Sequence, residues 1–197
     1  MEVTKPMNPH GNSANESHSA ELRAAANDDT DGKPSGAILG YLACPQDAAS
    51  GFIGALLITD ARARPLHFAY VTPIRPTTMQ RILYGATLAE HVKIDVIAMT
   101  LMQGVPVVPT VLFVDAPDLI SVRRVVDLPT ALLTRNTEPQ PGTSSLSTLK
   151  YDTGTNHEDQ EVIGQVLAEL EPWIDLVEPF TRLREAMKEA LKTPPKA

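Results

Sequence analysis

Asp60 raises the first question of chemistry in this sequence, because it lies where an apolar segment meets a polar turn. The segment GALLITDARARPLHFAYVTP, residues 54–73, has the pattern of two strands joined by a short loop. A carboxylate in that position can act as a general acid or base, or it can accept hydrogen bonds within the turn. Acidic residues at strand ends are common turn and cap residues, so the sequence favours the turn role.

Cys44 is the single cysteine of the chain and a second candidate for chemistry. It could act as a nucleophile with His67 or His91 as its base. Unreactive cysteines are among the most buried residues, and we therefore expect Cys44 to be a small apolar residue at the end of a strand. A single cysteine excludes an intramolecular disulfide and a multi-cysteine zinc site, and it fits a reducing cytoplasm.

A distinctive polar cluster surrounds the predicted start of a helix in PIRPTTMQRILYG, residues 73–85. Pro76 marks the helix start, and Arg75, Gln80, Arg81 and Tyr84 lie around it. Such a place offers backbone N–H groups and a positive dipole end to an anion or to a carboxylate of a partner. The alternative is that these side chains are solvated and have no ligand.

Motifs that hold cofactors are missing from the sequence. The glycines of GFIGALL, residues 51–57, precede a strand and are not followed by the Lys-Ser or Lys-Thr pair of a phosphate-binding loop. The G-x-G-x-x-G pattern of dinucleotide-binding folds is also absent. We therefore expect no nucleotide cofactor and no resident metal.

The charge of the chain is distributed unevenly. The net charge is −7, with 6 acids and 3 bases in residues 1–34, 7 and 8 in residues 35–135, and 11 and 6 in residues 136–197. Acidic flanks around a nearly neutral middle argue against binding to a nucleic-acid backbone or to an anionic membrane. No stretch approaches the roughly 18 consecutive apolar residues of a membrane span, and no secretory signal begins the sequence.

The 197 residues, 43% of them hydrophobic, are enough for one substantial core. We expect a disordered acidic tail over residues 1–34, an α/β core over 35–135, a flexible linker over 136–158 and a helical segment over 159–193. Within the core, apolar runs predict strands at 36–44, 51–60, 65–73, 110–115 and 128–135. Helical periodicity predicts helices over 76–103, with a break near Gly85, and over 116–127.

The C-terminal segment contains an apolar stripe at helical spacing. It consists of Leu176, Phe180, Leu183, Met187 and Leu191. Such a stripe must be buried somewhere, either on the sheet of its own chain or against another chain. Phe180, Leu183 and Met187 are the candidate interface residues.

The order strand, strand, strand, helix, strand, helix, strand resembles the ribonuclease H-like fold. That fold has a three-stranded antiparallel meander followed by parallel strands reached through helices. The resemblance implies that carboxylates hold two divalent metals for phosphodiester cleavage, with a central acid on the first strand. The predicted first strand, GAILGYLAC, contains no carboxylate, so the metal ligands of this alternative would be Asp60, Asp95 and Asp115.

The pattern GALLITD, RPLHF and RPTTMQRILYG also resembles one that recurs among bacterial proteins of unknown role. Two hypotheses follow from the sequence. The leading one is a small cytoplasmic accessory or interaction protein without evident catalytic chemistry, with a protein partner or a second copy and with neither nucleic acid nor membrane. The alternative is a metal-dependent nuclease or phosphotransfer enzyme on a degenerate ribonuclease H-like scaffold.

Overall fold

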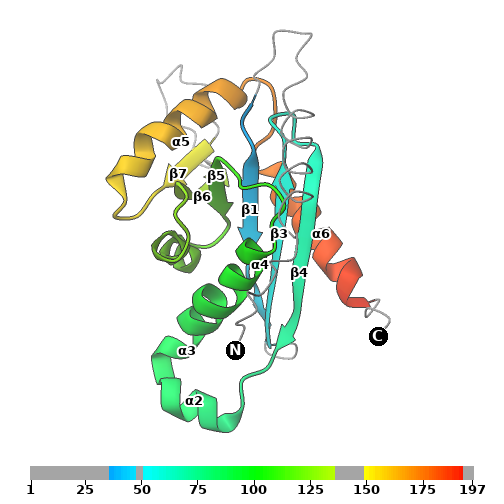
Figure 1. Cartoon of the computed structure of the whole chain (residues 1–197), viewed down its shortest axis with the longest axis vertical. Helices are drawn as coiled ribbons and strands as arrows, with labels where there is room; N and C mark the ends of the chain where they lie inside the picture. The colour runs from blue at the N-terminus through cyan, green and yellow to red at the C-terminus, as the bar shows by residue number, and fades with distance from the viewer. Residues whose placement is uncertain (1–35, 48–50, 136–148, 193–197) are drawn as a thin grey trace, which may run out of the picture.

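A computed structural model of the chain describes residues 36–47, 51–135 and 149–192. Its centre is β1 (Leu39–Ala43), which pairs antiparallel with β3 (Gly51–Thr59) and parallel with β5 (Val111–Val114). β4 (Pro65–Ile74) pairs antiparallel with β3, and β6 (Thr130–Arg135) pairs parallel with β5. The order β4-β3-β1-β5-β6 confirms the predicted ribonuclease H-like arrangement (Figure 1).

Two short strands complete the seven-stranded sheet. β2 (Gln46–Asp47) pairs with the start of β3, and β7 (Leu149–Asp152) pairs antiparallel with β6. β7 and the first residues of α5 (His157–Leu170) lie in the segment predicted as a flexible linker, so that expectation is wrong for residues 149–152 and 157–158. The rest of the predicted linker, residues 136–148, and the predicted tail, residues 1–34, lie outside the described residues.

The helical region after β4 is broken where the sequence predicts. α2 (Thr78–Tyr84) ends at Gly85, whose φ of +53° favours glycine. The chain continues through η1 (Gly85–Thr87), α3 (Leu88–Glu90), the π-helical turn η2 (His91–Ala98) and α4 (Met99–Gln103). We call residues 85–103 the helical arm. Figure 1 shows α2 beyond the end of the sheet, at the tip of this arm.

Each face of the sheet is covered by helices, which is why its central strands are continuous apolar runs. One face packs against the helical arm and against η3 (Pro117–Arg124). η3 is a 3-10 helix, whereas the sequence predicts an amphipathic α-helix in this segment. The arm lies very close to β3, since a Cβ atom on Gly54 would be only 2.2 Å from Ile97. The opposite face packs against α5 and α6 (Glu178–Lys192).

The apolar stripe of α6 is part of the core of its own chain. Phe180, Leu183 and Met187 are buried against β1 and β3, and the Phe180 ring meets the Tyr41 ring edge-on at 5.2 Å. These three side chains therefore have no surface left for a second chain, which corrects the expectation that they form an interface. Among the described residues no helix is long and apolar enough to cross a membrane.

Candidate functional site

Asp60 is a turn residue. Its carboxylate accepts hydrogen bonds from the backbone N–H groups of Arg62, at 2.9 Å, and Arg64, at 2.8 Å. It also pairs with the Arg64 guanidinium at 2.5 Å. The turn is tied to α6 by Arg182, which donates to the carbonyl of Ala63 at 2.9 Å. These donors occupy the carboxylate, so the structure supports the turn role that the sequence favours.

Asp115 lies directly after β5, with its side chain mostly buried. Burial raises the pKa of this carboxyl, and the Arg184 guanidinium at 2.7 Å acts in the opposite direction. Arg184 belongs to α6, so the C-terminal helix places a cation on this acid. Tyr41 lies in the middle of β1, the strand on which the resemblance to the ribonuclease H-like fold implies a central acid.

Asp95 lies on the helical arm and faces other partners. One of its carboxylate oxygens is 3.0 Å from Nδ1 of His91, and the other accepts a hydrogen bond from Arg124 at 3.2 Å. The side chain is 38% exposed. Its neighbours are therefore surface groups of the helical arm and η3.

The three acids are not brought together. Thr59, before Asp60, pairs with Leu39 at the start of β1, whereas Val114, before Asp115, pairs with Leu42 near its end. Three residues of a strand span about 10 Å. A two-metal site needs ligands around ions about 4 Å apart. No cluster of three or more metal-binding side chains occurs among the residues that the structure describes.

Cys44 is buried, as expected from the sequence. Burial, with a smaller contribution from the nearby Asp115 carboxylate, raises the pKa of its thiol to about 12. The thiol is therefore protonated at neutral pH and is a poor nucleophile. His67, the first base considered for it, is half-buried on β4, where burial lowers its pKa.

The polar residues around α2 have structural partners. Thr77 and Gln80 form a reciprocal capping box at the helix start, in which Oε1 of the Gln80 side chain already accepts a hydrogen bond from the backbone N–H of Thr77. Arg81 donates to the carbonyl of Pro76 at 3.3 Å. The Tyr84 ring stacks on the His91 ring, with centroids 4.6 Å apart. Arg75 is exposed before the helix.

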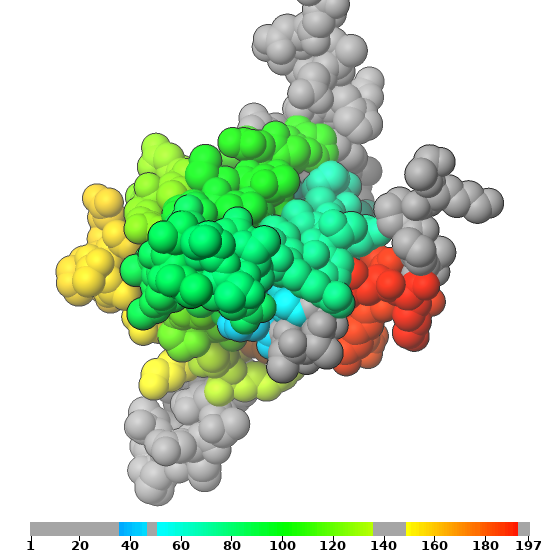
Figure 2. Space-filling model, turned by 90° about the horizontal axis from the view of Figure 1, so that it is seen from below, coloured from blue at the N-terminus to red at the C-terminus, as the bar shows by residue number. Residues whose placement is uncertain are grey.

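The apolar face of α2 is exposed, which periodicity alone does not predict. Met79, Ile82 and Leu83 are 63%, 71% and 73% exposed, and no residue of α2 is buried. In Figure 2, the view from below, α2 and the start of the helical arm, coloured teal to green, form the front of the molecule.

A second surface follows β4, the outermost strand on its side of the sheet. The rings of Phe68 and Tyr70 stack with centroids 6.0 Å apart and planes inclined by 24°, and Phe68 is 37% exposed. Residues 61–89, which include β4 and α2, contain four arginines and no acid. This local excess of positive charge is visible in the sequence, but averaging over residues 35–135 conceals it.

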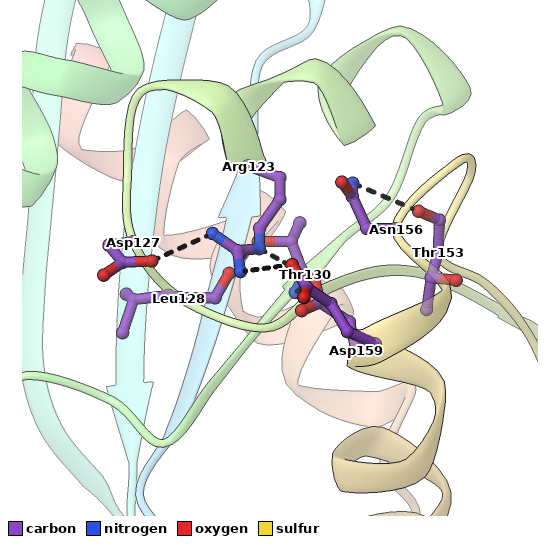
Figure 3. Close-up of polar contacts among 8 residues, drawn as sticks. Arg123, Asp127, Leu128, Thr130, Thr153, Asn156 and Asp159 are labelled. Carbon is purple, nitrogen blue, oxygen red and sulfur yellow. Dashed lines mark hydrogen bonds and ion pairs between the residues drawn. The ribbon is translucent and has the colours of Figure 1, made fainter.

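A polar cluster at the start of α5 joins three elements that are distant in sequence (Figure 3). Asp159 is buried and accepts hydrogen bonds from Arg123 of η3, at 2.9 Å, and from the backbone N–H of Thr130, at 3.1 Å. Arg123 also pairs with Asp127 at 3.1 Å and with Glu158 at 3.7 Å. Carboxylates therefore surround the guanidinium, and the cluster serves as a structural tie.

Comparison with solved structures finds nucleases. Endonuclease V of Ciona intestinalis, in complex with an inosine-containing DNA, is 13% identical with a TM-score of 0.35, and the match covers 88% of this chain and 66% of that one. Human endonuclease V is 14% identical with a TM-score of 0.36, over 78% of this chain and 67% of that one. This chain thus spans just under two thirds of the Ciona protein.

A ribonuclease H1 isolated from compost is 16% identical with a TM-score of 0.30, and the match covers 79% of this chain and 96% of that one. At such identities the likeness concerns the fold. No model of a known protein family matches the sequence, and neither does any curated protein.

These neighbours correct two expectations. The leading hypothesis, an accessory or interaction protein without catalytic chemistry, is contradicted because the similar structures are nucleases. The exclusion of nucleic acid as a partner is contradicted because endonuclease V of Ciona intestinalis is bound to DNA in two of these structures.

Proposed function

We propose that this protein binds single-stranded nucleic acid along the surface formed by β4 and α2. The observation that carries the proposal is the segregation of charge over residues 61–89. Four arginines and no acid lie in this stretch of a chain whose net charge is −7. Asp60 pairs with Arg64, whereas the guanidinium of Arg81 donates only to a neutral carbonyl. A polyanion is attracted to such a surface even where the whole protein is acidic.

The aromatic rings give the surface a second property that suits single strands. Phe68 and Tyr70 form a partly exposed stacked pair in the middle of β4. Unpaired bases stack on aromatic side chains with little sequence preference, and each such contact contributes about 1–3 kcal/mol. In a duplex the bases are already stacked on one another, so we expect single strands to bind more tightly than duplexes.

The arrangement of the arginines matches an extended ligand. Arg62 and Arg64 precede β4, and Arg75 and Arg81 follow it. A strand of 10 residues extends over about 30 Å, so charges lie at both ends of the aromatic pair. The Arg81 guanidinium donates to a neutral carbonyl and keeps its positive charge for a phosphate.

The cytoplasmic location predicted from the single cysteine is compatible with this function, since nucleic acid is abundant there. Membership of the bacterial family suggested by the motif around Asp60 is a further part of the proposal. Binding of nucleic acid to the surface over residues 61–89 depends on neither.

The experiment is a fluorescence anisotropy titration of a labelled single-stranded oligonucleotide of about 12 nucleotides, a length within the usual range of single-strand sites. The full chain should bind, and the double variant Arg75→Glu, Arg81→Glu should lose at least about tenfold in affinity. Lys150→Glu is the matched control, because Lys150 is exposed on β7 at the opposite edge of the sheet. Wild-type protein that does not bind, or a double variant that binds equally well, would refute the proposal.

A further inference from the structure

His91, at the start of η2, is the one histidine of the described residues that pairs with a carboxylate. Its Nδ1 atom lies 3.0 Å from Oδ2 of Asp95, four residues later on the same helical turn. Arg124 of η3 donates to the other Asp95 oxygen at 3.2 Å and holds the carboxylate in place. A histidine whose Nδ1 faces a fixed carboxylate presents its Nε2 for proton transfer, which is the arrangement of a general base.

The ring of His91 is held from a second side and remains accessible. It stacks on the Tyr84 ring, with centroids 4.6 Å apart and planes inclined by 18°. Nε2 of His91 has no hydrogen-bond partner among the described residues, yet it is not buried, in contrast to Nε2 of His67. The His91 side chain is 35% exposed. A ligand can therefore reach this nitrogen while the orientation of the ring is fixed.

His91 adjoins the proposed nucleic-acid surface. It begins a π-helical turn, and such turns occur frequently at functional sites. Tyr84, on which it stacks, ends α2, and Arg81 lies three residues before Tyr84 on that helix. Side chains at this spacing have Cβ atoms about 5–6 Å apart. A strand that follows α2 past Arg81 therefore reaches the Tyr84–His91 pair, in the part of the molecule that forms the front of Figure 2.

Ribonucleic acid supplies its own nucleophile for cleavage at such a place. The 2′-hydroxyl of each ribose lies next to the phosphate that joins it to the following nucleotide, and a base that removes the hydroxyl proton activates the oxygen. DNA lacks this hydroxyl. The separation of Asp60 from Asp115 at opposite ends of β1 is no obstacle to this reaction, because the reaction needs a base and not a pair of metal ions.

We propose that His91 is the general base of a ribonuclease activity on single-stranded RNA, an inference that rests on the proposed function. Nε2 of His91 takes the proton of a ribose 2′-hydroxyl, and the 2′-oxygen bonds to the adjacent phosphorus. The bond between that phosphorus and the 5′-oxygen of the next nucleotide breaks, and the 5′-oxygen takes a proton from water. The hydroxide that remains takes the proton back from His91. The products end in a 2′,3′-cyclic phosphate and a 5′-hydroxyl.

Incubation of the full chain with a labelled single-stranded RNA of about 12 nucleotides tests the proposal, with binding to a DNA of the same sequence measured in parallel by anisotropy. The wild type should cleave the RNA in the presence of EDTA, produce cyclic phosphate ends and leave the DNA intact. His91→Ala and His91→Gln should each lower the cleavage rate at least about 100-fold and bind the DNA like the wild type. His157→Ala is the matched control, since His157 is an exposed histidine at the start of α5, and it should cleave like the wild type.

Asp95 acts through His91 as a positioning residue. Asp95→Asn should lower kcat at least about tenfold and leave KM unchanged, because Asp95 holds the imidazole and does not touch the RNA. Wild-type protein that binds the DNA but leaves the RNA intact would overturn this inference and leave the proposed function standing. Cleavage that survives both His91 substitutions, or that EDTA abolishes, would overturn it as well. Wild-type protein that does not bind the DNA contradicts the proposed function itself, and this inference with it.

Discussion

Arg184 on α6 donates a hydrogen bond of 2.7 Å to the carboxylate of Asp115 at the end of β5. This pair joins residues 69 positions apart and places the Arg184 guanidinium beside the acid that follows the central parallel strand. It also fastens the C-terminal helix to the carboxyl end of β5. The structural role of the pair can be tested separately from nucleic-acid binding.

Replacement of Arg184 by methionine should destabilise the fold at neutral pH, because it leaves the mostly buried Asp115 carboxylate without its partner. Arg184 is about half exposed, so we expect a loss of only about 1–2 kcal/mol in the free energy of unfolding. Burial raises the pKa of Asp115, and removal of Arg184 raises it further. The full loss in the free energy of unfolding is therefore expected at pH values above this raised pKa. The loss should shrink as the pH falls through the pKa, because the carboxyl group is then protonated.

Urea unfolding at several pH values measures this dependence. Lys188→Met is the control, because Lys188 is an exposed cation on the same helix. An Arg184→Met deficit that did not change with pH would show that packing of the arginine side chain, and not its charge, supports the fold.

Substitution of Tyr41 should raise the stability of the fold, whereas substitution of Arg184 should lower it. Its ring is fully buried between Phe113 and Phe180, and its hydroxyl has no hydrogen-bond partner among the described residues. An unsatisfied buried hydroxyl costs about 1–3 kcal/mol, so Tyr41→Phe should raise the stability by up to that amount. Thermal melting should show an increase of a few degrees. Tyr151→Phe, at a partly exposed position on β7, should change little, and a lower melting temperature for Tyr41→Phe would show that the hydroxyl is satisfied.

A substitution at Ala63 tests the backbone conformation of the turn that Asp60 stabilises. Its φ is +59°, a left-handed conformation that is unfavourable for a residue with a Cβ atom. Ala63→Gly relieves this strain, and after the greater chain entropy of glycine is included we expect a gain of about 0.5–1 kcal/mol. Ala89→Gly in α3 should lose a similar amount, because its backbone is helical. If both substitutions destabilised the protein equally, the turn would not have this conformation in solution.

Of two acids that contact Arg123, Asp159 should contribute more to the stability of the fold than Asp127. Its side chain is 3% exposed, whereas that of Asp127 is fully exposed. Asp159→Asn disrupts the tie between η3, β6 and α5 and should cost about 3–5 kcal/mol, as for other broken buried pairs. Asp127→Asn should cost less than about 1 kcal/mol. Chemical denaturation of the two variants compares them directly, and equal losses would contradict a structural tie through Asp159.

The strand order could be predicted from the sequence because both faces of the sheet are covered. Strands buried on both faces appear as continuous apolar runs, so β1, β3 and β5 are clear in the sequence. β7 is not evident from the sequence, because three of its four side chains are exposed and its position depends on pairing with β6. That pairing is a tertiary contact with no local signal.

The candidate sites were harder to predict for two physical reasons. Asp60 and Asp115 both end strands, but only the pairing register shows that they lie at opposite ends of β1. The periodicity of Met79, Ile82 and Leu83 indicates an apolar face but does not show whether another element covers it, and here none of the described elements buries it. The acid-free stretch over residues 61–89 is visible in the sequence, but a sum of charge over residues 35–135 hides it.

The salt dependence of oligonucleotide binding tests the central claim most directly. Neutralisation of one phosphate each by Arg62, Arg75 and Arg81 predicts a slope of about −2 in a plot of log K against log salt concentration for a single strand. Arg81→Ala should reduce the steepness by about 0.7, and Lys150→Ala should not change it. A slope near zero for the wild type, or one that Arg81→Ala leaves unchanged, would contradict binding of nucleic acid along β4 and α2.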